Sequence, residues 1–139
     1  MAVDFVEREL TSGEFARLNA GFDEYGLEYG VAPISEVRYS YVVTDDTTFV
    51  GCVSGLQYQS WFYITDLWLE KSYRKQRLGA ELLSKIEAKA ALEGVKNIWT
   101  WTAGYEAAPF YQKYGYKIFC EFEDYYPTGQ SRIGLRKRL

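Results

Sequence analysis

Hydrophobic and polar positions follow two different periods along the chain, and the change of period separates predicted strands from predicted helices. Residues 37–69 are rich in β-branched and aromatic side chains and are interrupted at residues 45–46 and 59–60, which is typical of a three-stranded antiparallel meander. Gly51 and Gly55 lie inside the second strand and indicate a bulge or a close backbone neighbour. The predicted strands are Val37–Thr44, Thr48–Tyr58 and Trp61–Leu69.

A helical period replaces this pattern after residue 77. Glu81 and Lys85 form an i,i+4 pair there, and Gly94 suits the position after a helix end. The apolar stripe of this predicted helix consists of Leu78, Leu82, Leu83, Ile86 and Ala90. Helical spacing also appears from Ser12, a candidate N-cap, to about Tyr29, with a break at Gly21 as an alternative.

Shorter elements complete the prediction. A short helix is expected at Ala107–Tyr114, where Pro109 is tolerated in the first turn. Further strands are expected at Val3–Val6, Asn97–Thr102, Tyr116–Phe122 and Arg132–Leu135. A chain of 139 residues is the size of one ordinary domain, so we expect a single domain over residues 1–139.

The composition, with 47% hydrophobic and 25% charged residues, is that of a packed globular protein. No apolar run approaches the roughly 20 residues of a membrane span. Asp4, Glu7 and Glu9 lie within the first ten residues, where a signal peptide would have an apolar run. We therefore expect a cytoplasmic protein without a membrane partner. The net charge is −3, yet four bases gather within seven residues. They are Lys71, Arg74, Lys75 and Arg77. One dense basic segment in an acidic chain favours a local anion site over nucleic-acid binding.

The absence of histidine removes the usual base of serine and cysteine hydrolases and the commonest zinc ligand, so no metal is expected. The glycine spacing fits neither the dinucleotide fingerprint nor the P-loop. Cys52 and Cys120 lie in strand-like apolar runs and are interpreted as core thiols.

The junction between the strand ending at Leu69 and the helix beginning near Leu78 carries the candidate chemistry. A helix N-terminus exposes unpaired N–H groups and a partial positive charge, and the basic segment surrounds this one. The alternative interpretation is a solvated charged turn in front of an amphipathic helix.

This junction resembles the acyl-CoA-binding segment of the GNAT acetyltransferase superfamily, typically Arg or Gln, two residues, Gly, one residue, then Gly or Ala. Arg74 takes the first position, Arg77 stands where the first Gly would be, and Gly79 is last. The segment 107–116, with its Tyr-Gly-Tyr ending, resembles the late helix of the family. The order of the predicted helices and strands resembles that of the family over nearly the whole chain.

The resemblance implies an α+β fold: a twisted, mostly antiparallel sheet of about six to seven strands flanked by helices, with splayed central strands forming an acyl-CoA cleft. Acetyl-CoA is the implied co-substrate. Its pyrophosphate would bind the amides opening the helix, and its pantetheine arm would bind the strand edge. The implied cofactor-binding residues are Leu67, Trp68, Leu69, Arg74, Lys75, Gln76, Arg77, Leu78, Gly79 and Ala80.

Tyr111 occupies the position that the family uses to supply a proton or hydrogen bond to the departing thiolate. The base for the amine stays open between a water chain and the carboxylates Asp66, Glu70, Glu106 and Glu123. Two departures from the family pattern are Arg77 and the segment 104–106, which holds no Asn. If residue 77 needs a positive φ, an arginine costs about 1–2 kcal/mol relative to glycine.

We therefore expect an N-acetyltransferase that transfers an acetyl group from acetyl-CoA to a primary amine of a small molecule or protein by direct attack in a ternary complex. The alternatives are a non-catalytic acyl-CoA-binding or regulatory domain and a protein-interaction domain. No nucleic-acid partner is expected, and a homodimer stays open. Acidic and aromatic residues suit a cationic acceptor, or else form a solvated surface. They are Glu24, Tyr25, Glu28, Tyr29, Tyr125 and Tyr126.

Overall fold

The contacts of the computed structural model, which describes residues 2–33, 35–104 and 107–139, divide the chain into two compact units. The units are Met1–Ser35 and Glu36–Leu139, and each is described by itself. Within the described part of the first unit, helix α1 (Ser12–Glu28) is the one regular element. The predicted strand at Val3–Val6 is wrong, because a short β-type segment becomes a strand only by pairing with another strand.

Helix α1 begins one residue away from the predicted N-cap. Thr11, and not Ser12, caps the helix: its hydroxyl accepts from the amide of Glu14 at 3.2 Å, and the Glu14 carboxylate accepts from the amide of Thr11 at 3.2 Å. This reciprocal pair is a capping box, which satisfies two amides that a single Ser12 cap would leave open. The helix runs unbroken through Gly21.

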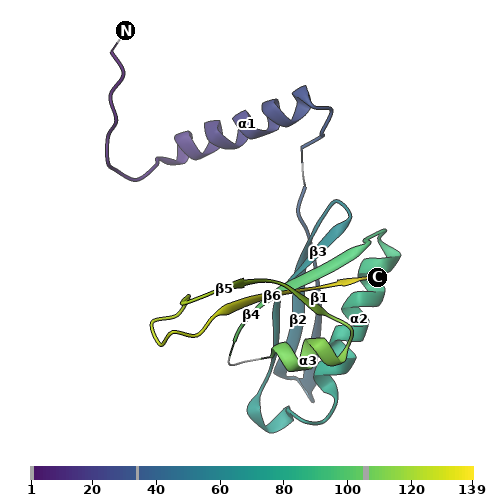
Figure 1. Ribbon diagram of the computed structural model, residues 1–139. Coiled ribbons are helices and arrows are strands. Elements are labelled where there is room, and N and C mark those ends of the chain that lie inside the picture. The colour runs from purple at the N-terminus through teal and green to yellow at the C-terminus, as the bar shows by residue number, and fades with distance from the viewer. Residues whose placement is uncertain (1, 34, 105–106) are drawn as a thin grey trace. The chain divides into compact units, whose positions relative to one another are not determined.

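The second unit is a six-stranded sheet with the order β1-β2-β3-β4-β6-β5 (Figure 1). Only β3 and β4 pair in parallel, and every other described pair is antiparallel. The mixed α and β fold with six strands confirms the predicted fold class. The strands are β1 (Val37–Asp45), β2 (Thr48–Tyr58), β3 (Trp61–Leu69), β4 (Asn97–Ala103), β5 (Lys117–Phe122) and β6 (Arg132–Arg138).

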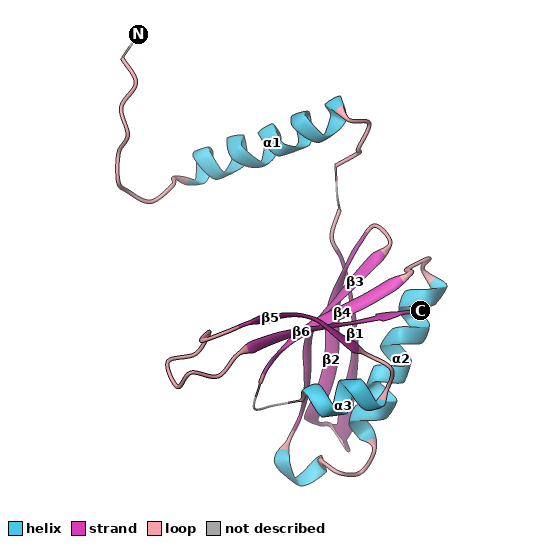
Figure 2. Cartoon of the chain, in the orientation of Figure 1, coloured by secondary structure: helices cyan, strands magenta, loops and turns pink. Residues whose placement is uncertain are grey.

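Two helices, α2 (Leu78–Leu92) and α3 (Ala108–Lys113), pack with the sheet into one hydrophobic core (Figure 2). The predicted stripe of α2 supplies the buried residues Leu82, Leu83, Ile86 and Ala90. Gly94, at φ +85°, follows the C-cap of α2, as its position in the sequence predicts. Pro109 lies in the first turn of α3, also as predicted.

A bulge in β3 opens the sheet between β3 and β4. The register of β2 against β3 shifts at Ser54/Gly55, so Thr65 is an extra residue without a Cα partner on β2. Pairing of β3 with β4 ends at Ile64↔Thr100, directly before this residue. The hydroxyl of Thr100 donates to the carbonyl of Ile64 at 3.0 Å and ties the two strands at the point where they separate. Beyond that point β3 and β4 diverge.

Gly55 permits this bulge because its backbone lies against the neighbouring strand. A Cβ there would stand 2.4 Å from both the Phe62 ring and the Tyr63 carbonyl oxygen. The sequence prediction of a close backbone neighbour in the second strand is thereby confirmed. Within the described residues, no helix has the length and apolarity that a membrane span requires.

Candidate functional site

Two adjoining cavities occupy the gap between the diverging strands β3 and β4. One, of ≈ 220 Å³, extends to Thr100 where the strands separate, and the other, of ≈ 230 Å³, extends to Arg74 and Gly79 at the start of α2. Both are lined by Leu67, Trp68, Ala107 and Tyr111. The shared lining places the two cavities side by side, and together they are called the β3–β4 cleft.

The edge of β3 that faces the cleft offers backbone hydrogen-bonding groups. The amide of Glu70 donates to the carbonyl of Val50 on β2 at 2.8 Å. Backbone groups alternate sides along a strand, so Leu67 and Leu69 direct theirs away from β2. Because β4 pairs with β3 only as far as Ile64, the backbone of Leu67 meets the cleft and not a neighbouring strand.

The segment between β3 and α2 begins with a single 3-10 turn, η1 (Lys71–Tyr73). The Tyr73 hydroxyl donates to the Asp45 carboxylate at the end of β1, which fixes the turn to the sheet. Lys75 (φ 64°) and Arg77 (φ 63°) both adopt the left-handed conformation. Arg77, in the family's glycine position, therefore incurs the cost of about 1–2 kcal/mol that a positive φ imposes on a residue with a side chain.

Helix α2 begins with its backbone amides open. Its N-cap, Arg77, makes no side-chain capping hydrogen bond, so the amides of Leu78, Gly79 and Ala80 face outward. The four surrounding bases are largely exposed, and none belongs to an ion pair among the described residues. They are Lys71, Arg74, Lys75 and Arg77. Glu81 lies in the first turn of α2, but no capping hydrogen bond is made by the N-cap side chain, so the helix start combines positive charge with open N–H donors.

Tyr111 lines the cleft from α3, opposite β3. It is 5% exposed, and its ring packs against Phe110 and Tyr116 at centroid distances of 5.2 and 5.3 Å. The position of α3 is set from β4: the Thr102 hydroxyl accepts from the amide of Ala107 at 3.2 Å. The phenol is therefore held on a rigid support at the wall of the cavity.

The structure does not bring every sequence-predicted residue to the cleft wall. Leu67, Trp68, Leu69, Arg74, Gly79 and Tyr111 line it. The side chain of Gln76 turns back and donates to the carbonyl of Ser72 at 3.2 Å, and Leu78 lines a different cavity on the other flank of α2. Lys75, Arg77, Leu78 and Ala80 lie at or just before the start of α2 and are not among the residues that line the two cavities.

Of the candidate bases, Asp66 lines the cleft. Glu70 follows the end of β3, and Glu123 lies in the turn after β5, so neither lines the two cavities. Glu106 and Tyr105, in the segment 104–106 that holds no Asn, lie outside the described residues.

Six described residues of the cleft wall were not singled out from the sequence. They are Thr65, Thr100, Trp101, Thr102, Ala107 and Phe110. The alternation of β4 could have indicated the buried hydroxyls of Thr100 and Thr102, since a buried threonine needs a hydrogen-bond partner. Apart from Gly55 on the neighbouring strand, no feature of the sequence indicates a bulge at Thr65.

The two cysteines, Cys52 and Cys120, are free and half-buried, and the thiol of Cys52, which feels the charge of Asp66, is not activated. Burial, followed by the negative charge of Asp66, raises the pKa of the Cys52 thiol above its ordinary value. A thiol held in its protonated form is a poor nucleophile, which argues against an acyl-cysteine intermediate at Cys52.

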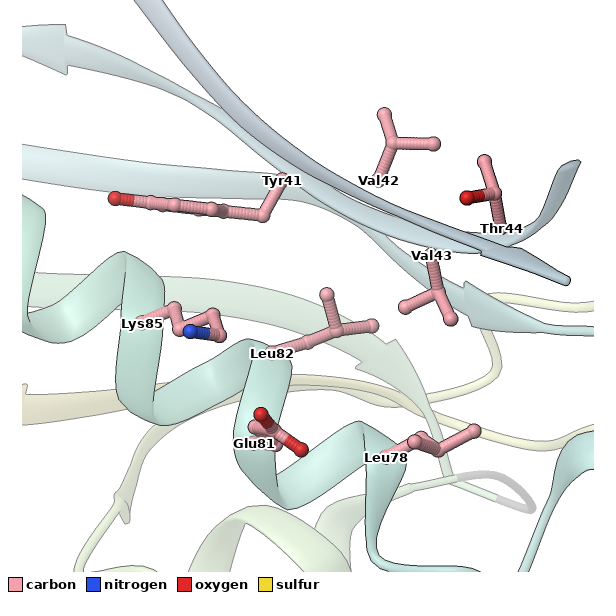
Figure 3. A pocket seen from close by; sticks show the side chains of 8 residues that line it. All are labelled: Tyr41, Val42, Val43, Thr44, Leu78, Glu81, Leu82 and Lys85. Carbon is pink, nitrogen blue, oxygen red and sulfur yellow. The ribbon is translucent and has the colours of Figure 1, made fainter. Parts of the chain in front are cut away.

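A larger cavity of ≈ 370 Å³ lies between β1 and α2 (Figure 3). Tyr41 and Val43 point toward the helix, Leu82 lies between them, and Val42 points to the opposite face of the sheet (Figure 3). The strand bordering it, β1, is paired with β2 over its whole length, and the basic segment does not line it. Its charged lining residues are one acid and one base, Glu81 and Lys85, and it has neither the diverging strands nor the basic segment of the β3–β4 cleft.

Comparison with known proteins places this geometry in a family. Residues 36–118 match the model of the Acetyltransferase (GNAT) domain. A blasticidin-S acetyltransferase of Streptomyces morookaense is 33% identical over 88 residues, which cover 63% of this chain and 64% of that protein. The chain thus matches slightly less than two thirds of the length of that relative.

Solved structures extend the similarity. An acetyltransferase from Bacillus cereus has a TM-score of 0.84 at 29% identity, covering 98% of both chains. A GNAT family acetyltransferase from Elizabethkingia anophelis with acetyl-CoA bound has a TM-score of 0.63 at 20% identity, covering 72% of this chain and 75% of its own. With the family model matching well over half of the chain, this protein belongs to the GNAT acetyltransferase family.

Proposed function

We propose that the protein is an N-acetyltransferase that binds acetyl-CoA in the β3–β4 cleft and transfers the acetyl group to a primary amine. One observation carries the proposal: the open amides of Leu78, Gly79 and Ala80, with their ring of bases, adjoin a cleft bordered by the unpaired edge of β3. A diphosphate fits the first feature and an extended amide chain fits the second, and CoA carries both groups in this order.

In this proposal the pantetheine arm hydrogen-bonds the backbone of Leu67 as an added strand and brings the thioester to the junction of the two cavities. The backbone amides at this edge would stabilise the oxyanion of the tetrahedral intermediate. Tyr111 would give a hydrogen bond to the sulfur as the thiolate leaves. A phenol near pKa 10 is a weaker acid than a thiol near 8.5, so full proton transfer is uphill by about 2 kcal/mol.

Asp66 is the described carboxylate best placed to receive the amine, since it lines the same cleft as Tyr111. Its charge would attract an alkylammonium group, which passes one proton to Asp66 or through water to solvent. The neutral amine then attacks the thioester carbon directly, and the nitrogen loses a second proton by the same route as the amide forms. Bond formation to nitrogen and expulsion of the CoA thiolate complete the transfer without a covalent enzyme intermediate, which agrees with the unactivated thiol of Cys52.

Two fold neighbours support the choice of co-substrate and acceptor. The Elizabethkingia anophelis structure holds acetyl-CoA, and an aminoglycoside 6'-N-acetyltransferase complexed with coenzyme A has a TM-score of 0.65 to this chain at 21% identity. The remaining proposals are that residues 1–139 work as one N-acetyltransferase domain and that the protein is cytoplasmic.

The test is thiol release from acetyl-CoA in the presence of a panel of primary amines, with mass spectrometry of the acetylated products. The proposal predicts amine-dependent release of free CoA. Tight binding of acetyl-CoA without turnover of any amine would instead establish a non-catalytic acyl-CoA-binding domain. If acetyl-CoA neither binds nor raises the unfolding temperature, both readings are wrong.

A further inference from the structure

We propose that Arg38 selects the acceptor, and that the acceptor is an amine carrying a carboxylate, such as an amino acid. This inference rests on the function proposed above. It starts from a group of polar side chains on the sheet face opposite α2, at the end of the cleft where β3 and β4 separate.

The register of the strands places this group on one face. Tyr39, Tyr41 and Val43 pack against the core, so Arg38 and Ser40, the residues on either side of Tyr39, point to the opposite face. Ser40 pairs across the strands with Ser54, and Ser54 pairs with Asp66. Ser40, Ser54 and Asp66 therefore form one row over β1, β2 and β3, with directly opposite Cβ atoms about 5 Å apart.

The Arg38 side chain lies across this row toward the cleft. Its Nη1 donates to the Ser54 hydroxyl at 2.8 Å and to the Thr65 hydroxyl at 3.0 Å. Thr65 is the bulge residue and a lining residue of the cleft. The guanidinium thus reaches from β1 to β3 and lies next to the position at which the acceptor would meet the thioester.

Arg38 interacts electrostatically with Tyr58, whose hydroxyl donates to the Glu36 carboxylate, but it makes no hydrogen bond to a described acid of the second unit. Both of its hydrogen-bond partners are neutral hydroxyls, and no ion pair of the described residues includes it. Nε and Nη2 carry three further N–H groups that make no hydrogen bond within the described part of the chain. These groups form the planar fork that binds a carboxylate through two parallel hydrogen bonds.

The hydroxyls around Arg38 leave one more donor. The Thr65 hydroxyl donates to the carbonyl of Ser54 at 3.1 Å, so its hydrogen is used. The hydroxyls of Ser40 and Ser54 lie 2.7 Å apart, and this contact uses one of their two hydrogens. The other hydrogen of this pair of hydroxyls is free to donate. A free donor adds to the affinity of the side chains around Arg38 for an anion, whereas a cation would need an acceptor.

Asp66 supplies the opposite charge in the same row. It is exposed, lines the cleft and belongs to no ion pair of the described residues, including one with Arg38. An aminocarboxylate fits both charges: its ammonium group meets Asp66 at the cleft, and its carboxylate meets Arg38 farther out. A simple amine or a polyamine would leave Arg38 without a partner.

The test compares acceptors that differ only in the carboxylate, namely a set of amino acids and the corresponding carboxamides, with acetyl-CoA saturating. We expect kcat/KM of the wild-type protein to favour the acid by about 10- to 100-fold, the worth of hydrogen bonds to a charged group. Arg38→Gln should reduce this preference to within about threefold while the affinity for acetyl-CoA stays unchanged, and Arg38→Lys should keep part of it.

Arg8→Gln, which removes an exposed arginine from the segment before α1, is the charge-matched control and should keep the wild-type preference. Ser40→Ala, a smaller change within the same row, should lower the preference without removing it. Equal turnover of acid and amide by the wild type, or an unchanged preference in Arg38→Gln, overturns the inference but leaves the proposed function standing. Bound acetyl-CoA with no turnover of any amine overturns both.

Discussion

Arg74 Nε donates a hydrogen bond of 3.0 Å to the carbonyl oxygen of Leu69. This contact joins the basic segment to the strand edge that borders the cleft, since Leu69 ends β3 and Arg74 lies four residues before α2. One guanidinium thereby holds the turn in place with Nε and keeps its remaining N–H groups and its charge near the helix start. The two halves of the proposed acetyl-CoA site are thus coupled through a single side chain.

Arg74→Ala should therefore weaken acetyl-CoA binding by about 10- to 100-fold, because it removes both a hydrogen bond to a charged group and the anchor of the turn. Isothermal titration with acetyl-CoA measures the change. Lys96→Ala, which removes a base at the opposite end of α2 just before β4, is the matched control and should bind like the wild type. Equal affinity in the Arg74 variant would show that the diphosphate lies elsewhere.

Arg77 allows the conformational cost of its left-handed backbone to be measured. Arg77→Gly removes the cost of a positive φ, whereas Arg77→Ala keeps it, and both remove the charge. The glycine variant should be more stable than the alanine variant by about 1 kcal/mol in urea unfolding. Both variants should bind acetyl-CoA more weakly than wild type. If alanine is as stable as glycine, residue 77 does not hold φ near 63° in solution.

Tyr111→Phe separates catalysis from binding. Loss of the hydroxyl should lower kcat by about 10- to 100-fold, within the lower range for a positioned acid or hydrogen-bond donor, and leave the dissociation constant of acetyl-CoA unchanged. Tyr114→Phe, at the C-cap of the same helix and outside the two cavities of the cleft, is the matched control. A Tyr111→Phe protein with wild-type kcat would place the proton donor on another group.

Gly55→Ala should destabilise the fold, because its Cβ would stand 2.4 Å from the Tyr63 carbonyl oxygen and the Phe62 ring. Forced overpacking of this kind costs about 1–3 kcal/mol or more. The control, Gly21→Ala in α1, meets only the end of the Arg17 side chain at 3.5 Å and should be stabilising by about 0.5–1 kcal/mol. Chemical denaturation measures the free energy of unfolding of both variants. Equal changes in this free energy for Gly55→Ala and Gly21→Ala would contradict the prediction.

The Tyr116 hydroxyl predicts how stability changes at alkaline pH. It donates to Glu87 at 2.8 Å, and burial, followed by the charge of Glu87, raises the pKa of Tyr116 far above its ordinary value. The unfolded tyrosine ionises near pH 10 and the folded one does not, so stability is complete below about pH 10 and falls above it.

One such group contributes a slope of about 1.4 kcal/mol per pH unit above pH 10. Tyr116→Phe should remove that contribution and give a shallower decline when the free energy of unfolding is followed from pH 9 to 11. An identical decline in wild type and variant would mean that Tyr116 is accessible to water and ionises in the folded protein.

Much of the fold could be predicted because local pattern and tertiary environment agree in the second unit. The strands Thr48–Tyr58 and Trp61–Leu69 have the predicted bounds, and α2 buries the predicted stripe except for Leu78, which is half-buried. Val3–Val6 was predicted wrongly because strand formation depends on a partner, which composition does not reveal. The apolar residues of α1 show the same limit: their spacing predicts a helix correctly, yet the first unit taken by itself buries none of them.

The candidate site was predictable where it depends on consecutive residues and not where it depends on register. The basic segment and the start of α2 are adjacent in sequence, so charge and helix polarity indicated them together. The row Ser40, Ser54 and Asp66 joins three strands. Asp66 lies opposite Ser54 because of the bulge in β3, and the position of this bulge is defined only by the pairing of β2 with β3. Arg38 could therefore not be predicted as a site residue from the sequence, because its neighbours are defined by the pairing of the strands.

The central claim is that the amides opening α2 bind the diphosphate of acetyl-CoA while the β3 edge binds its pantetheine arm. Backbone amide NMR of the isotopically labelled protein during titration with acetyl-CoA tests it most directly. We expect the largest shifts at Leu78, Gly79 and Ala80, together with a shift at Leu67. Shifts confined to Tyr41, Val43 and Lys85, which line the cavity between β1 and α2, would contradict it.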